Sequence, residues 1–226
     1  VHSDKFFGAG DDVSGNFNNF TNNNTVVTST HTPTNSHCTM SPLHHNPAST
    51  LSNGNRTIND LSASWRVTLG TLPIPPSGKW YWEMTFSTGS SDGMTFGVCE
   101  VDFNAALAAS TNNNAWAYST YGSFYSGGSS ASYGDVPVNT DTIGVSMNMD
   151  TGDLTFYVDN VSQGVAVGSL TGSKLVYANL YDSWVPTFHF EEADWTYTPP
   201  TGHVALNTTN IAAATTRTAS DTNKYF

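Results

Sequence analysis

Between Lys79 and Phe190 this 226-residue chain repeats one pattern: apolar and polar residues alternate for a short stretch, and a tight turn follows. Successive side chains of a β-strand point to opposite faces, so Lys79–Phe86 places its two tryptophans, Met84 and Phe86 on one face. The sequence Asp150-Thr151-Gly152-Asp153 joins two such stretches in the manner of a hairpin turn. The pattern predicts antiparallel sheets with one apolar and one solvated face.

The alternating stretches recur at a spacing of roughly 8–12 residues, which is typical of a sandwich or a barrel. The expected strands are residues 79–86, 94–101, 143–149, 154–158, 161–167, 174–181 and 185–190. Parallel βαβ units would need helices between these strands, and the helix signals are weak. Asn104–Ser110 is expected to form at most a turn or two, and the Ala-rich run Ile211–Ala214 is too short to stand alone.

Composition indicates a folded chain with a neutral, polar surface. Charged residues are only 11% of the chain, whereas aromatic residues reach 12%, which is unlike a disordered sequence. Three regions separate: an Asn/Thr-rich extension at 1–62, expected to pack on the sandwich or on neighbouring subunits, a β-sandwich at 63–192, and a second extension at 193–226. The polar segment that begins at Val1 is no signal peptide and indicates a processed chain or a fragment.

Charge excludes two classes of partner. Seven basic residues stand against eighteen acidic ones, for a formal net charge of −11, and no Lys/Arg cluster is present. Nucleic-acid binding depends on such clusters, so we expect no nucleic-acid partner. An anionic membrane surface would repel the chain, and no apolar stretch is long enough to span a bilayer, so we expect no membrane insertion.

Motifs typical of phosphate-binding, dinucleotide-binding and zinc-protease sites are absent from the sequence. It contains no Walker loop, H-E-x-x-H or dinucleotide fingerprint, and we therefore expect no enzymatic activity and no cofactor. His37, His44 and His45 lie near a single cysteine, Cys38, whereas structural zinc needs several paired Cys or His ligands. We interpret these histidines as polar loop residues and expect no metal. A bridge between Cys38 and Cys99 stays open.

Most acidic residues of the chain have an explanation in turn chemistry. Asp150 and Asp153 stand where hairpin turns favour Asp, because its carboxylate bonds to nearby backbone groups. No facing carboxylate pair of the kind that glycosidases use is evident. The segment from Glu191 to Asp194 leaves a loose calcium site as an open alternative.

Two segments resemble the SPRY domain, the core of B30.2. Ser77–Glu83, with the sequence SGKWYWE, is similar to a characteristic strand of that family. The stretch from Asp141 to Val161 resembles its hairpin pair, although Asn160-Val161 replaces the usual Asn-Gly. Together with the strands around Gly97 and at 175–190, the resemblance covers about residues 65–192. It implies an all-β, bent antiparallel β-sandwich, a concanavalin-like two-sheet jelly roll, with irregular terminal extensions.

The flanking segments resemble parts of bacteriophage virion proteins. Pro33–Leu43 is similar to a lead-in found before SPRY modules of tailed-phage structural proteins, and Ala205–Ile211 is similar to a segment that follows them. This resemblance implies a virion protein of tail-fibre, spike or capsid-fibre type, located in the extracellular particle. Its implied partners are other virion subunits and a host-surface protein or glycan, and a homo-oligomer, with a trimer favoured, is expected.

The family implies a recognition scaffold whose loops at one end form the ligand site, with no cofactor, metal or enzymatic activity. Tyr and Trp on loops rich in Gly, Ser and Asn suit a recognition surface. The candidate ligand-binding residues are Asn112, Asn113, Asn114, Trp116, Tyr121, Tyr125, Tyr181, Asp182 and Trp184. For Trp116, Tyr118 and Tyr133 a place in the core is an open alternative.

Three functional interpretations remain at this stage. The first is a non-enzymatic virion protein that presents the SPRY module on a fibre or capsid surface and contacts host-surface protein or glycan. The second is an adaptor for virion assembly or capsid decoration that binds neighbouring subunits. The third is a cellular SPRY module that recognises a peptide.

Overall fold

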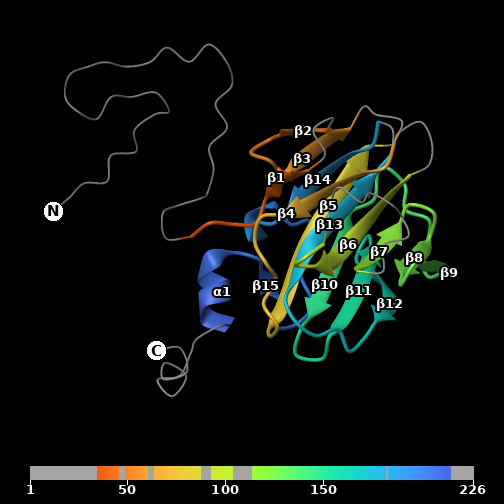
Figure 1. Ribbon diagram of the computed structural model, residues 1–226. Coiled ribbons are helices and arrows are strands. Elements are labelled where there is room, and N and C mark those ends of the chain that lie inside the picture. Colours follow the sequence, from red (N-terminus) through yellow and green to blue (C-terminus); the bar gives the residue numbers. More distant parts are fainter. Residues whose placement is uncertain are drawn as a thin grey trace, which may run out of the picture. The chain divides into compact units, whose positions relative to one another are not determined.

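A computed structural model describes residues 35–45, 49–60, 64–87, 93–103, 114–181 and 183–214. Two antiparallel sheets pack face to face, which confirms the expected β-sandwich (Figure 1). One sheet has seven strands, in the order β1 (Met40–His45), β4 (Arg66–Gly70), β13 (Lys174–Leu180), β6 (Met94–Glu100), β7 (Ala115–Ser119), β8 (Ser123–Ser126) and β9 (Ser129–Ser132).

The second sheet contains the residues that carry the strongest alternation. Its order is β12 (Val161–Val167), β11 (Asp153–Val158), β10 (Ile143–Asn148), β5 (Lys79–Ser87), β14 (Val185–His189), β3 (Thr57–Asp60) and β2 (Ser49–Ser52), and β15 (Val204–Ala205) runs parallel beside β5. The seven strands expected from alternation are all present, with ends that differ by one residue at most. The hairpin between β10 and β11 closes with Asn148 opposite Asp153, as expected.

The core lies between the two sheets and is rich in aromatic rings. Phe156 of β11 sits at its centre, with ring centroids of Tyr118 at 5.2 Å and Phe96 at 5.9 Å. Tyr118 is fully buried, and Tyr133 packs on the same cluster with its ring 5.2 Å from that of Tyr118. For both tyrosines the core alternative is therefore the right one.

The outer face of β5 is covered, and the expectation of a solvated face is wrong there. Tyr81 and Glu83 alternate away from the core, yet both are buried. The segment after β14 crosses this face and brings the Trp195 ring to 5.0 Å from that of Tyr81. The carboxylate of Glu83 accepts hydrogen bonds from the Tyr81 hydroxyl (3.0 Å) and from the backbone N–H groups of Thr196 (2.6 Å) and Tyr197 (2.9 Å).

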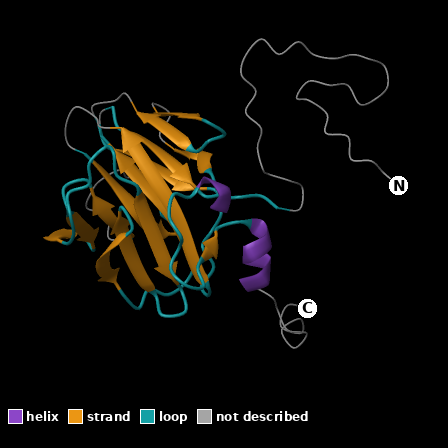
Figure 2. Ribbon diagram, turned by 180° about the vertical axis from the view of Figure 1, so that it is seen from behind, coloured by secondary structure: helices purple, strands orange, loops and turns teal. Residues whose placement is uncertain are grey.

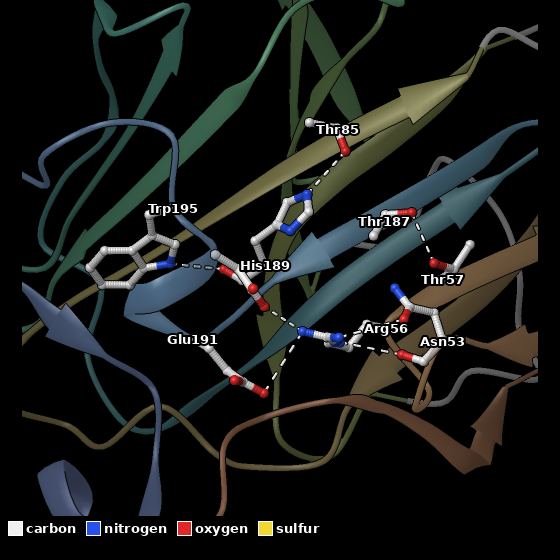
Figure 3. A network of polar contacts seen from close by, with 9 residues as sticks. Asn53, Arg56, Thr57, Thr85, Thr187, His189, Glu191 and Trp195 are labelled. Atoms are coloured by element: carbon white, nitrogen blue, oxygen red, sulfur yellow. Dashed lines mark hydrogen bonds and ion pairs between the residues drawn. The ribbon is translucent and has the colours of Figure 1, made fainter. Parts of the chain in front are cut away.

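A polar network ties this crossing segment to the β2–β3 hairpin (Figure 3). The guanidinium of Arg56 forms an ion pair with Asp194 and lies 3.8 Å from the carboxylate of Glu191. Glu191 precedes the short 3-10 helix η1 (Glu192–Asp194), and Asp194 is its last residue. The Trp195 indole N–H donates to the carbonyl of His189 at 2.9 Å. Arg56 thus pairs with Glu191 and Asp194, two of the carboxylates for which the sequence left a calcium site as an alternative, and the network anchors the segment.

Strands and a helix also form within the regions expected to be terminal extensions. β1, β2 and β3 lie within residues 40–60 and belong to the two sheets. The helix α1 (Thr208–Ala214) begins earlier than Ile211, because the Asn207 side chain accepts a hydrogen bond from Asn210 N–H and caps the first turn. The helices η1 and α1 both lie beside the sheets (Figure 2). The helical turn expected at Asn104–Ser110 lies outside the described residues.

The two flanking segments meet each other. Backbone hydrogen bonds join Cys38 N–H to Leu206 O at 2.9 Å and Thr208 N–H to Ser36 O at 2.9 Å. The Thr208 hydroxyl accepts a further bond from Ser36 N–H at 2.9 Å. The described chain therefore enters and leaves the sandwich at the same place.

The two cysteines are free and buried on opposite sides of the seven-stranded sheet. Cys38 belongs to the core between the sheets, whereas Cys99 belongs to a second cluster with Val67, Leu69 and Tyr177 on the outer face. The sheet separates the two thiols, so the bridge that the sequence left open does not form. Burial raises the pKa of Cys38 to about 11 and also raises that of Cys99.

Candidate functional site

Strand register brings several loop aromatics to one end of the seven-stranded sheet. Leu180, the last residue of β13, pairs with Arg66 at the start of β4 and with Met94 at the start of β6. Thr95 pairs with Ser119, the last residue of β7. Four strands, β13, β4, β6 and β7, therefore begin or end at this end of the sheet. We call the surface formed there by Trp65, Gly93, Tyr121 and Tyr181 the aromatic end.

The aromatic end is built from rings held by neighbouring backbone. The ring centroids of Trp65 and Tyr181 are 5.6 Å apart, and both side chains are half-buried. Tyr181 N–H donates to Gly93 O at 3.3 Å. Tyr121 is 55% exposed, and its ring lies over Gly93, where an added Cβ would come within 2.9 Å of it. Gly93 has a φ of 68° and leaves room for this close approach.

Trp184 was expected on this surface, and that expectation is wrong. Its side chain is only 8% exposed and packs with a ring-centroid distance of 5.6 Å against Phe86 at the end of β5. Ser183, which precedes Trp184, adopts a left-handed backbone conformation with a φ of 62°. Tyr181 therefore lies at the surface and Trp184 enters the core, although they are three residues apart.

The remaining candidates do not join the aromatic end. Trp116 pairs with Val98 and lies 5.4 Å below the ammonium of Lys174, at the opposite edge of the sheet. Asn114 lies at that edge too, since its carbonyl accepts from Glu100 N–H. Tyr125 of β8 is half-buried opposite Ala117. Asn112, Asn113 and Asp182 lie outside the described residues.

Sequence reasoning missed several residues that the structure places at surfaces of interest. Trp65 directly precedes β4, and its place beside Tyr181 follows from long-range strand pairing. Trp195 and Tyr197 belong to the segment that crosses β5, and they were assigned to a polar extension. The alternation of Trp195, Thr196 and Tyr197, with two aromatic residues two positions apart, was the available signal.

The described residues contain no group of three or more His, Cys, Asp or Glu side chains arranged to hold a metal ion. No helix within the described ranges is long and apolar enough to cross a membrane. The buried titratable groups are structural. Burial lowers the pKa of His189, whose Nε2 lies 3.0 Å from the Thr85 hydroxyl. The aromatic end presents the side chains of Trp65, Tyr121 and Tyr181 at the surface.

Comparison with known proteins gives a consistent picture of the fold. A family model described as SPRY domain matches residues 79–189. The SPRY domain of human HERC1 is similar over 66% of this chain and 96% of its own, with a TM-score of 0.58 and 16% identity. The TRIM65 PSpry domain is similar over 69% and 93%, with a TM-score of 0.54 and 16% identity.

A further solved structure, that of stonustoxin, is similar over 68% of this chain and 27% of its own, with a TM-score of 0.54 and 15% identity. No curated protein matches the sequence. At these identities the solved structures establish the fold and nothing about ligands.

Proposed function

Because residues 79–189 are a SPRY domain, a fold that serves as a protein-interaction module, we propose that this sandwich binds a protein partner through its aromatic end and catalyses no reaction. The observation that carries the proposal is the 55% exposure of Tyr121 beside the half-buried rings of Trp65 and Tyr181. Rigid aromatic side chains bury a large area at a low cost in conformational entropy, and they dominate binding energy at interfaces.

A peptide library displayed on yeast and selected against the full chain tests this proposal. The selected peptides are expected to bind Tyr121→Ser about thirtyfold more weakly, because loss of a central aromatic anchor costs about 2 kcal/mol or more. Val101→Ser is the matched control, since Val101 is 52% exposed and follows Glu100 at the end of β6 opposite to Met94 and the aromatic end. Equal affinity for both variants would contradict the assignment of this surface.

The finer proposal is that the module belongs to a bacteriophage virion and contacts a host-surface protein or glycan. It rests on the resemblance of Pro33–Leu43 and Ala205–Ile211 to phage segments, and the comparisons bear on the SPRY domain alone. Backbone hydrogen bonding between Ser36 and Thr208 joins the two phage-like segments into one structural unit, which is consistent with this origin. Light scattering on the purified chain is expected to give a trimer; a monomer at micromolar concentration would count against a fibre or spike.

The second candidate is an adaptor between virion subunits, and a different set of exposed side chains speaks for it. The exposed aliphatic side chains of Leu43, Val136 and Val138 favour it, because they are more than half exposed. An adaptor is expected to bind other proteins of the particle and no host cell. Cell-binding measurements with the labelled chain separate these alternatives.

A further inference from the structure

The segment that crosses β5 forms an open cavity of about 450 Å³ on the outer face of the eight-stranded sheet. The residues that matter for its chemistry are Glu192, Trp195, Tyr197, Pro199 and His203. None of them belongs to the aromatic end. The cavity therefore represents a second surface that the proposed function does not use.

The aromatic walls of this cavity are fixed by buried contacts. The indole N–H of Trp195 donates to His189 O at 2.9 Å, and its ring stands edge-on to Tyr81 with an interplanar angle of 86°. The backbone N–H of Tyr197 donates to the buried carboxylate of Glu83. Trp195 and Tyr197 are both half-buried, so part of each ring stays accessible. Because both rings are already held in place, a ligand loses little binding free energy to the ordering of these side chains.

Besides Trp195 and Tyr197, the cavity is lined by His203, whose imidazole ring is neutral. A carbonyl oxygen can only accept, so the 3.1 Å contact of His203 Nδ1 with Pro200 O places the proton on Nδ1. Nε2 then accepts from the Ser146 hydroxyl at 2.8 Å. Burial lowers the pKa of His203, which agrees with an uncharged ring at neutral pH. The histidine therefore adds no positive charge to the cavity.

Glu192 supplies the charge of the cavity. Its neighbours Glu191 and Asp194 are paired with Arg56, whereas within the described part of the chain Glu192 has no ion-pair partner. Its exposed carboxylate accepts one long hydrogen bond, 3.4 Å, from Ala205 N–H. The side chain of Lys79 lies beside Gly202 and acts on His203, and it forms no ion pair with Glu192. With a formal net charge of −11, the whole chain also attracts cations.

We propose that this cavity binds the guanidinium group of an arginine side chain on a partner protein. A guanidinium is planar, stacks on aromatic faces and donates two parallel hydrogen bonds to one carboxylate, which matches two accessible rings beside an unpaired glutamate. A lysine ammonium makes a cation–π contact but lacks the fork and the plane, so it binds more weakly. A neutral sugar uses the rings but gains nothing from the charge.

The test is an NMR titration of the full chain with Nα-acetyl-arginine N-methylamide, observed at the indole N–H of Trp195. The signal is assigned by its loss in Trp195→Phe. We expect arginine to shift this signal in a saturable way, and the citrulline analogue, which has the same shape without charge, to bind at least tenfold more weakly. Glu192→Gln is expected to weaken arginine binding about tenfold.

The controls separate this site from general attraction and from the aromatic end. Asp102→Asn removes one exposed carboxylate elsewhere and is expected to leave the titration unchanged. Tyr121→Ser is expected to leave it unchanged too, so that a failure of the aromatic end and a failure of this cavity give different results. Equal binding of citrulline, an equal effect of Asp102→Asn, or a shift caused by methyl glucoside and not by arginine would each overturn the proposal.

Discussion

The buried carboxylate of Glu83 is predicted to hold the C-terminal segment on the sheet, and Glu83→Gln tests this. Glu83 is 0% exposed, and its two oxygens accept from one hydroxyl and two backbone N–H groups. Glutamine keeps the shape but replaces one acceptor with an NH₂ donor. In either orientation of the amide, a donor faces the N–H of Thr196 or of Tyr197, and that N–H loses its partner.

The magnitude follows from these bonds. A hydrogen bond to a charged group contributes about 1.5–3 kcal/mol, and a buried N–H left without an acceptor costs about 1–3 kcal/mol. Because the amide keeps one oxygen, we expect Glu83→Gln to lower the free energy of unfolding by about 2–4 kcal/mol. The loss is expected to be local as well: hydrogen exchange becomes faster at the amide of Thr196 or of Tyr197, whichever faces the new NH₂ group, because that amide has lost its acceptor.

Urea unfolding followed by tryptophan fluorescence measures the first quantity, and hydrogen exchange measures the second. Glu192→Gln is the matched control, since Glu192 belongs to the same segment but is exposed, and surface changes of this kind usually stay within about 0.5 kcal/mol. A Glu83→Gln protein as stable as the control, with unchanged exchange at Thr196 and Tyr197, would refute the reasoning.

Three more predictions concern the packing and the titration of the sandwich. Gly97→Ala is expected to lower the free energy of unfolding by about 1–3 kcal/mol, since the new Cβ would lie 2.1 Å from the Trp116 carbonyl oxygen; Gly168→Ala meets only the tip of a carboxylate and serves as its control in the same urea assay. Phe156→Ala is expected to cost about 3–5 kcal/mol, because it empties the centre of the aromatic core, and a smaller loss would mean that the core refills. Burial lowers the pKa of His203 below its ordinary 6.5, so the unfolded chain takes up a proton that the folded ring does not; stability is therefore complete above about pH 6.5 and falls as the pH decreases towards the folded pKa. His203→Gln is expected to flatten this slope in unfolding measured between pH 7 and 5, and an unchanged slope would argue against a shifted histidine.

Local patterns were sufficient to predict seven strands of the sandwich. Alternation identified the strands and the core face of each one, because a side chain's face is determined by its position in the strand alone. Turn chemistry predicted the connections: Asp159 and Asn160 have φ values of 46° and 66°, which short polar side chains tolerate. In each case the residues that determine the structure lie within a few positions of one another.

The covered face of β5 could not be predicted in the same way. Alternation assigns Tyr81 and Glu83 to solvent, and the segment that buries them lies more than a hundred residues further along the chain. Nothing local indicates that Thr196 and Tyr197 would supply the donors. The candidate site could not be predicted for the same reason, since Trp65 contacts Tyr181 only because β4 pairs with β13.

The aromatic end and the cavity share no residue and belong to different sheets, which has a consequence for binding. Tyr121 is carried by strand ends of the seven-stranded sheet, whereas Glu192 is carried by the segment over the eight-stranded one. Effects of substitutions at sites without common partners usually add within about 0.5 kcal/mol. If one protein partner touches both surfaces, the losses from Tyr121→Ser and Glu192→Gln should add in the double variant. If different partners use them, each substitution should weaken only one partner, so the double variant distinguishes a single extended interface from two separate ones.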